Sequence, residues 1–350
     1  MKNILLSVTF VLLLAGGCKK SFLPNKVDFE ILATNTDASL RGLFVLNENV
    51  VWASGSEGTV LLSVDGGISW KVDKVPGAAA NDFRSIYAWD DKRAMVFGVA
   101  GPDFAYRTND GGATWEVVYS DTTAGLFFNS LKFANADLGL AISDPVDGKF
   151  FVIRTEDGGK NWEQVQELPP VENGEANFAA SNTCIEYLAS GKAWFASGGK
   201  AARVFYSDDF GKSWQVKKTP MIRGEAASGI FSVAFTNDRE GAIVGGIYDR
   251  PELNTNIAAY TIDGGKNWLQ SETMPKGYRS CVQTVEYEGG NFWFAIGKTG
   301  CDVSDDGGRS WTFLSDEGYY TFRAVPGQAA GQAAGFAAGA DGKISRVRFQ

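Results

Sequence analysis

Six aspartates recur along the chain at nearly regular intervals, and carboxylates are side chains that could do acid–base chemistry. Each is the third residue of an octet that begins with Ser or Thr, contains a glycine-rich turn and ends in Trp. The octets are SVDGGISW (63–70), TNDGGATW (108–115), TEDGGKNW (155–162), SDDFGKSW (207–214), TIDGGKNW (261–268) and SDDGGRSW (304–311). Their aspartates, which lie 43 to 54 residues apart, are Asp65, Asp110, Asp157, Asp209, Asp263 and Asp306.

This spacing argues against catalysis by these aspartates. A carboxylate pair that hydrolyses a glycosidic bond is roughly 5–10 Å apart, whereas a period of about 45 residues is typical of one blade of a β-propeller. Each aspartate is therefore expected on a different blade. There, the first-position hydroxyl and the carboxylate can accept backbone N–H groups of a tight turn whose glycines supply positive φ. We interpret the six aspartates as structural.

The sequence ahead of each octet predicts the strands that would position it. A near-continuous apolar run precedes every octet and fits a strand that is buried on both faces. These predicted second strands cover residues 50–55, 94–101, 138–144, 192–199, 241–246 and 291–297. Ahead of each lies a predicted inner strand, at residues 40–46, 83–89, 128–134, 183–189, 230–235 and 281–287.

A seventh unit follows the last octet. It has three strand-like runs, at 322–325, 335–342 and 344–349, but no octet and no fourth strand. The segment 27–36 is strand-like and has no blade of its own, so we expect it to supply the missing outer strand and close the ring. The sequence thus predicts an all-β fold, a single seven-bladed β-propeller over residues 27–350 with an N-terminal strand closing the last blade.

The octet resembles the Asp-box, or BNR, repeat of sialidases and of the photosystem II assembly-factor family of propellers. The resemblance covers nearly the whole chain after its leader. It implies that each box joins the two outer strands of a blade, away from the ligand site. The pattern FRSI or FRAV resembles the assembly-factor group more closely, in which arginines on one face form a protein-docking patch. The sialidase Arg-Ile/Leu-Pro signature is missing, since Arg41-Gly42-Leu43 stands there.

Arginines lead the candidate binding residues at the expected mouth of the channel. Arg41, Arg84 and Arg323 share one inner-strand position on blades 1, 2 and 7, which the predicted closure makes neighbours, and Arg279 lies close by on blade 6. Several arginines facing one mouth would attract a carboxylate or another anion. In the alternative interpretation, each arginine pairs with a local acid such as Asp82.

Long connections add further candidates on the same side of the ring. Two of them, at 172–183 and 223–229, repeat a GEA triplet, and two others, at 143–150 and 246–260, are inserts between the second and third strands. Long loops on a rigid scaffold are where binding residues concentrate. The residues singled out there are Glu175, Glu225, Asp144, Asp249 and Tyr278.

Composition limits the chemistry further. The 350 residues carry a net charge of −8 and include no histidine. An acidic chain is a poor candidate for binding nucleic acid, and without histidine there can be no His-based triad or His-ligated zinc. We find no motif for a cofactor or metal, so none is expected.

The first residues form a targeting signal. Lys2 precedes an apolar stretch over residues 4–15, too short to span a membrane, and AGGC ends at Cys18. This ending resembles a bacterial lipoprotein signal over residues 1–17, which implies a lipid on Cys18, a tether over 18–26 and attachment to the cell envelope. Lys19 and Lys20 after the cysteine suggest the outer membrane. The alternative is an ordinary cleaved signal.

Three cysteines remain after the signal, Cys184, Cys281 and Cys301. Their odd number leaves at least one thiol free. A disulfide between Cys281 and Cys301 is one option, and Cys184 fits a small core residue.

Two functions are compatible with these observations. The first is a monomeric, non-catalytic envelope lipoprotein that binds a protein partner or an anionic or glycan ligand at the channel mouth, in an assembly or scaffold role. The alternative is a sialidase-like glycoside hydrolase, for which the resemblance allows a Tyr nucleophile in place of histidine chemistry.

Overall fold

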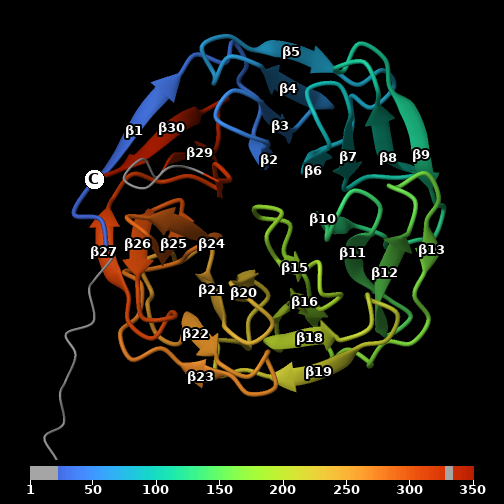
Figure 1. Ribbon diagram of the computed structural model, residues 1–350. Helices are drawn as coiled ribbons and strands as arrows, with labels where there is room; N and C mark the ends of the chain where they lie inside the picture. Colours follow the sequence, from blue (N-terminus) through green and yellow to red (C-terminus); the bar gives the residue numbers. More distant parts are fainter. Residues whose placement is uncertain (1–22, 328–333) are drawn as a thin grey trace, which may run out of the picture.

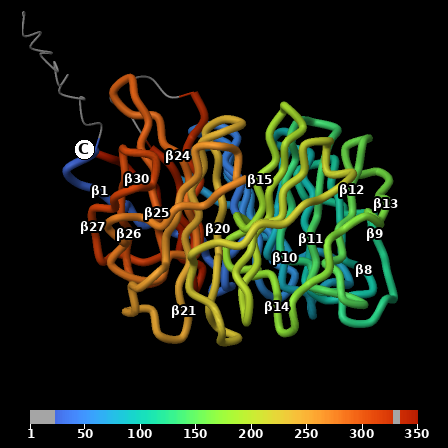
Figure 2. Tube along the Cα trace, turned by 90° about the horizontal axis from the view of Figure 1, so that it is seen from below, coloured from blue at the N-terminus to red at the C-terminus, as the bar shows by residue number. Residues whose placement is uncertain are grey.

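Seven β-sheets stand around a central channel in the computed structural model, which describes residues 23–327 and 334–350 (Figure 1). Each sheet is one blade, and its strands pair antiparallel in order from the channel to the periphery. Figure 2 shows the same ring edge-on, with the blades side by side. The predicted all-β seven-bladed propeller is confirmed.

The blades follow one plan of four strands, to which two short strands are added in the sheet of blade 5. The inner strands are β2 (Leu40–Val45), β6 (Phe83–Ala88), β10 (Phe128–Phe133), β15 (Ile185–Tyr187), β20 (Ser228–Phe235), β24 (Cys281–Tyr287) and β28 (Thr321–Ala324). The second strands are β3 (Val51–Gly55), β7 (Ala94–Gly98), β11 (Gly139–Val146), β16 (Ala193–Ala196), β21 (Gly241–Ile247), β25 (Gly290–Gly297) and β29 (Ala334–Ala338).

The outer half of each blade holds the remaining strands. The third strands are β4 (Thr59–Ser63), β8 (Asp103–Thr108), β12 (Lys149–Thr155), β18 (Arg203–Ser207), β22 (Ala258–Thr261), β26 (Gly300–Ser304) and β30 (Ile344–Phe349). The outermost strands are β5 (Lys71–Lys74), β9 (Glu116–Ser120), β13 (Glu163–Gln164), β19 (Gln215–Lys218), β23 (Leu269–Gln270), β27 (Thr312–Ser315) and β1 (Val27–Leu32).

The two ends of the described chain close the ring in blade 7. Strand β1 pairs antiparallel with β30 in a continuous register from Val27 opposite Phe349 to Leu32 opposite Ile344. The pairing supplies the missing outer strand, as the sequence predicted, and it covers the edge that β30 would otherwise expose. A salt bridge from Arg346 to Glu30 spans the same pair of strands at 3.0 Å.

Apolar side chains pack between neighbouring blades, because second strands are buried on both faces. All five residues of β3 and of β7 are buried. Between blades 3 and 4, the rings of Phe150 and Phe195 meet edge to face at 5.2 Å. Each such ring contributes about 1.5–3 kcal/mol by its removal from water. The core is therefore a ring of inter-blade layers that holds the loops at the channel rigidly.

Blade 4 departs from the predicted strand boundaries. Its inner strand, expected over 183–189, is reduced to β15, and its second strand, expected over 192–199, is divided into β16 and a short β17 (Gly198–Gly199). Strand β17 pairs with β14 (Glu175–Ala176) and with β20, so both short strands extend the sheet of blade 5. The residues between β14 and β15 are thereby released from the sheet and directed toward the channel.

The cysteine positions exclude one predicted option. Cys184, Cys281 and Cys301 are free and buried. Ile296 of β25 pairs with Cys281 on one side and Cys301 on the other. Two strand spacings separate the thiols by about 10 Å between backbones, beyond the about 7 Å that a disulfide tolerates. The option of a disulfide between Cys281 and Cys301 is therefore wrong.

The targeting signal, Cys18 and residues 18–22 of the tether lie outside the described residues. Within residues 23–327 and 334–350, no helix is long and apolar enough to cross a membrane.

Candidate functional site

The six aspartates of the Asp-boxes form hydrogen bonds within their own turns. Asp65 Oδ1 accepts from Ser63 Oγ at 2.8 Å and from Ser69 N at 2.9 Å, and Oδ2 accepts from Ser69 Oγ at 2.6 Å. Gly66 has a φ of +72°, which favours glycine. The Ser69 hydroxyl and amide, with Ser63, lower the pKa of Asp65 to about 2. With one box on each of blades 1 to 6, these carboxylates form no catalytic pair.

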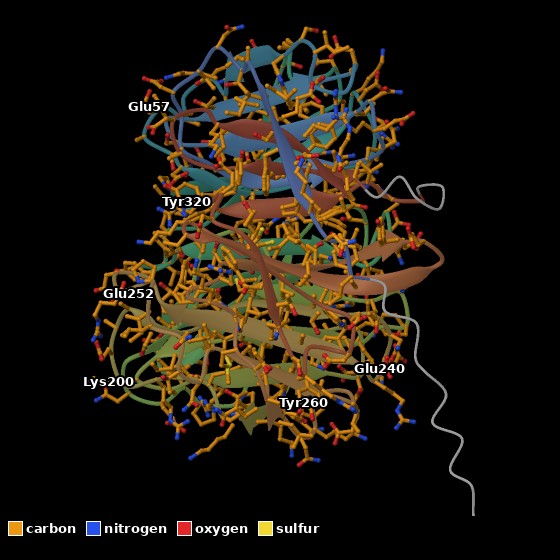
Figure 3. The ribbon with its side chains drawn as sticks, turned by 90° about the vertical axis from the view of Figure 1, so that its left-hand side faces the viewer. Glu57, Lys200, Glu240, Glu252, Tyr260 and Tyr320 are labelled. Atoms are coloured by element: carbon orange, nitrogen blue, oxygen red, sulfur yellow. The ribbon has the colours of Figure 1, made fainter. Side chains whose placement is uncertain are left out.

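A cavity of about 460 Å³ opens at the mouth of the channel, on the face where the inner strands begin. Side chains of this face include Tyr320, labelled in Figure 3. We call this the mouth cavity. Its lining residues are Arg41, Arg84, Asp144, Ala176, Asn177, Phe178, Ala179, Ala180, Ala226, Phe231, Tyr248, Tyr278, Lys298 and Tyr320.

The floor of the mouth cavity is a loop of the chain itself, residues 177–182, which we call the channel loop. It precedes β15 and reaches toward the centre of the ring (Figure 1). Arg41 Nη1 donates to Ala180 O at 3.2 Å, and Arg84 Nη1 donates to Ala179 O at 3.4 Å. Arg323 Nη2 donates to two further carbonyls of the loop, both at 3.1 Å. Three predicted arginines therefore converge on one segment.

These three arginines differ in how their charges are balanced. Arg84 Nε pairs with Asp82 at 2.7 Å, as the alternative interpretation expected. Among the described residues, neither Arg41 nor Arg323 forms an ion pair with a carboxylate, and Arg41 stacks over Tyr320 at 4.0 Å. Burial, together with the positive charge of Arg84, lowers the pKa of Arg41. Arg323 holds the channel loop but does not line the mouth cavity, whereas Arg41 lines it with a charge that no described carboxylate pairs with.

Aromatic rings form the opposite wall of the mouth cavity. Phe178 and Phe231 stack at 4.0 Å between centroids, and Tyr278 and Tyr248 meet the Phe231 ring edge-on at 4.8 and 6.3 Å. Burial raises the pKa of Tyr278, which keeps its phenol neutral. Tyr278 is the one member of this group that the sequence analysis assigned to the site. Phe178 and Phe231 gave no signal of their own, because Phe178 lies in a long connection marked for its glutamate and Phe231 in a predicted inner strand.

Asp144 is the only carboxylate among the described residues that line the mouth cavity. Its Oδ1 accepts from Asn177 N at 3.0 Å and Asn129 Nδ2 at 3.1 Å. Burial raises its pKa above the ordinary value for aspartate. A single carboxylate does not make the pair that most glycoside hydrolases use.

Arg279 lies away from the mouth cavity, although the sequence placed it there. Its side chain and that of Asp302 are each 1% exposed and pair at 2.6 Å. Arg279 Nη1 donates to Tyr278 O at 2.9 Å and Thr299 Oγ1 at 3.3 Å. Because Arg279 is enclosed by its own blade, it supports the chain beneath Tyr278 and offers nothing to a ligand.

Three of the four predicted loop acids, Glu175, Glu225 and Asp249, also lie outside the cavity lining. Glu175 is buried, where it pairs with Arg203 Nε at 2.9 Å and accepts from Ser197 Oγ at 2.5 Å. The pairing of β14 with β17 turns its side chain inward. Glu225 and Asp249 both face the exposed Arg250, which forms an ion pair with Glu225. These acids fix the loops around the mouth rather than line it.

Among the described residues, no three Cys, Asp or Glu side chains are grouped so that they could hold a metal ion. The arrangement in the mouth cavity suits recognition: guanidinium donors on one side, flat apolar rings on the other, and a backbone floor between them. The ligand-binding role of Arg41, Arg84, Arg323, Asp144 and Tyr278 stays a prediction.

Comparisons with known proteins agree with the repeat and the fold. The BNR/Asp-box repeat model matches residues 205–216, which contain the box of blade 4. No curated protein matches the chain in sequence. The predicted resemblance to Asp-box propellers is confirmed in the repeat and in the architecture.

Three solved structures illustrate the fold. YCF48 bound to D1 peptide has a TM-score of 0.63 and 18% identity, over 93% of this chain and 99% of that one. YCF48 from Cyanidioschyzon merolae has a TM-score of 0.59 and 17% identity, over 92% and 98%. The GH74 xyloglucanase from Xanthomonas campestris has a TM-score of 0.55 and 13% identity, over 90% and 60%.

Proposed function

We propose that this Asp-box propeller is a non-catalytic binding protein that holds a segment of a protein partner in the mouth cavity. The observation that carries the proposal is the unneutralised charge of Arg41 beside a wall of aromatic rings. A carboxylate next to an aromatic or apolar side chain, on one peptide, would meet both walls. The similar fold of YCF48 bound to D1 peptide supports a peptide as the ligand.

The channel loop supports this proposal within the molecule. It is an irregular segment whose carbonyls are already held by guanidinium groups at 3.1–3.4 Å. A guanidinium has five N–H donors, and within the described residues one hydrogen bond leaves the Arg41 side chain. Its other donors are free for a bidentate pair with a carboxylate, which is the strongest contact that an arginine makes. Aromatic and arginine side chains are also the groups that dominate protein interfaces.

Co-purification from solubilised membranes tests the proposal. The tagged wild-type chain is compared with Arg41→Gln/Arg84→Gln and with Arg348→Gln, a matched change at an exposed arginine of β30 whose partner is Glu30. We expect the Arg41/Arg84 variant to lose a partner that wild type and Arg348→Gln retain. Recovery of the same proteins by all three would overturn the proposal.

A glycoside hydrolase is the second candidate, and two observations favour it. Asp144 has a raised pKa, as a general acid needs, and the xyloglucanase shares the fold. The assay uses a fluorogenic sialoside and xyloglucan. Turnover by wild type that disappears in Asp144→Asn would replace the binding proposal with catalysis. We expect no turnover above a buffer blank.

We also propose that the protein works at the cell envelope, held by a lipid on Cys18. This rests on the apolar stretch and the AGGC ending of the leader. Metabolic labelling with an alkyne fatty acid should mark wild type and leave Cys18→Ser unlabelled. Equal labelling of both would contradict the anchor.

A further inference from the structure

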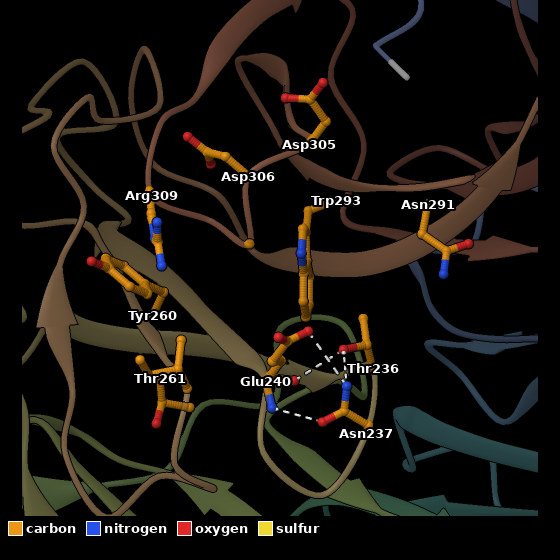
Figure 4. Close-up of a pocket in the computed structure, with 12 residues that line it drawn as sticks. Thr236, Asn237, Glu240, Tyr260, Thr261, Asn291, Trp293, Asp305, Asp306 and Arg309 are labelled. Atoms are coloured by element: carbon orange, nitrogen blue, oxygen red, sulfur yellow. Dashed lines mark hydrogen bonds between the residues drawn. The ribbon is translucent and has the colours of Figure 1, made fainter. Parts of the chain in front are cut away.

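A second cavity lies between blades 5 and 6, on the side of the ring away from the mouth cavity. Its volume is about 400 Å³ (Figure 4). Figure 3 shows Glu240, one of its residues, on the face opposite Tyr320 of the mouth cavity. We call it the box groove, because the Asp-box of blade 6 forms one of its walls. Strand β22 and the turn from β20 to β21 form the other wall.

The Asp-box of blade 6 lacks a hydrogen bond that the other five boxes have. In those five, the fourth residue after the aspartate donates its side-chain hydroxyl or amide to Oδ2, at 2.5–2.7 Å. In blade 6, Ser304 Oγ and Ser310 N both bind Oδ1 of Asp306, at 2.9 Å each. Within the described residues no group donates to Asp306 Oδ2, so this acceptor is available at the box groove.

A neighbouring segment accounts for the difference. Residues 271–273, which follow β23, lie along the tip of the blade 6 box. Glu272 N donates to Arg309 O at 2.7 Å, Trp311 N donates to Thr273 O at 3.2 Å, and Thr273 forms a parallel bridge with Ser310. Ser310 is thus part of a bridge that the equivalent residues of the other described boxes do not form, and its hydroxyl is not on the carboxylate.

An unpaired donor faces the same groove. Trp293 of β25 is 4% exposed and lines the box groove. The tryptophans of two other second strands, Trp52 and Trp194, donate their indole N–H to backbone carbonyls of the next blade, at 2.9 Å each. Trp293 Nε1 has no hydrogen-bond acceptor among the described residues. In Figure 4 the indole stands across the groove from Tyr260 and Arg309.

We propose that the box groove binds a neutral saccharide. A sugar hydroxyl donates and accepts hydrogen bonds at once, so adjacent hydroxyls can satisfy the donor Trp293 Nε1 and the acceptor Asp306 Oδ2 together. Neither atom has a hydrogen-bond partner among the described residues, and a ligand in the groove would pair both. The groove has the volume of a small-ligand site.

The rest of the lining selects among ligand classes. Within the described residues the Glu240 carboxylate makes one long hydrogen bond, from Asn237 Nδ2 at 3.4 Å, so it retains capacity to accept from further hydroxyls. Arg309 lies over the Tyr260 ring at 5.4 Å, and the two present a flat surface to the C–H face of a sugar. The carboxylates of Glu240, Asp305 and Asp306 disfavour an anion.

Saturation-transfer NMR tests the proposal, with maltose, cellobiose and diacetylchitobiose as neutral probes, sialyllactose as the anionic probe and trilysine as the cationic probe. Trp293→Phe removes the indole N–H while keeping an aromatic ring, although a smaller one, and Asp306→Asn turns the free acceptor into a donor. Trp52→Phe and Asp110→Asn are the matched controls on other blades. Thermal melts show which variants remain folded.

We expect at least one neutral probe to bind, with affinity reduced about five- to tenfold in Trp293→Phe and in Asp306→Asn, as for one lost hydrogen bond, and unchanged in the controls. Binding of trilysine or sialyllactose alone would overturn the saccharide assignment. Unchanged sugar binding by both folded variants, or no binding of any neutral probe, would overturn the site. The mouth variant Arg41→Gln/Arg84→Gln should bind the sugar as wild type does.

Discussion

The Asp-box rim and the mouth cavity both carry charged residues that recur from blade to blade, but they pair those charges differently. On the rim, Asp65 is saturated by the hydroxyls and amides of its own octet. At the mouth, Arg41 reaches from blade 1 to a carbonyl of a distant loop and pairs with no described carboxylate. The box aspartates, which are paired within their own turns, therefore stabilise the scaffold. An arginine without a carboxylate partner at the mouth cavity is available to bind a ligand.

Arg279 is paired inside its own blade, whereas Arg41 lines the mouth cavity without a described carboxylate partner. Substitution of Arg279 should show this difference most strongly. Its loss would leave the Asp302 carboxylate buried and unpaired, since both side chains are 1% exposed. We expect Arg279→Ala to lower the free energy of unfolding by about 3–5 kcal/mol, measured by urea denaturation. A loss below about 1 kcal/mol would mean that Arg279 is not part of the scaffold.

Substitution of Arg41 should affect partner binding and leave stability nearly unchanged. Arg41→Gln removes a charge that no described carboxylate balances, and burial already disfavours that charge. We expect the urea midpoint to change little, while affinity for the co-purified partner falls at least tenfold, as for a lost charge-assisted pair. A variant that unfolds readily but binds normally would reverse the comparison.

The contribution of the box aspartates to stability should depend on pH. The pKa of Asp65 and that of Asp110 are lowered to about 2, so their stabilisation is fully present above the unfolded value of about 3.9 and is lost as pH falls through 2. The stability difference between wild type and Asp65→Asn/Asp110→Asn should therefore shrink between pH 4 and pH 2. Urea midpoints across that range measure it, and a constant difference would contradict the assignment.

The smallest effect is expected at the edge of the mouth. Glu225 and Arg250 form an ion pair in which both side chains are largely exposed, and such pairs contribute about 0–1 kcal/mol. Glu225→Gln should leave both the urea midpoint and partner recovery near wild type. Loss of the partner in this variant would extend the binding surface beyond the mouth cavity.

Much of the fold follows from the sequence because each blade encodes itself locally. Each octet, each apolar second strand and the strand-like segment 27–36, which contains β1, can be recognised from a few consecutive residues. Blade 4 broke the pattern because Glu175 forms a buried ion pair with Arg203, a contact 28 residues away in the chain that no local periodicity contains.

The site was less accessible to the sequence, because it depends on which residues long connections bring together. Arg41, Arg84 and Arg323 share an inner-strand position and could be grouped, but the channel loop that joins them could not be foreseen. Arg279 carries the same charge near the same edge, and only its neighbour Asp302 separates it from the others. Phe178 lies in a loop that the sequence marked for its glutamate alone.

Photo-crosslinking tests the central claim most directly. A photoreactive phenylalanine analogue replaces Tyr248, a half-exposed residue of the mouth cavity, or Lys160, an exposed residue of the blade 3 box. After irradiation of intact cells, adducts are identified by mass spectrometry. We predict one protein crosslinked at Tyr248 and absent at Lys160. No adduct at Tyr248, or the same adducts at both positions, would contradict recognition at the mouth cavity.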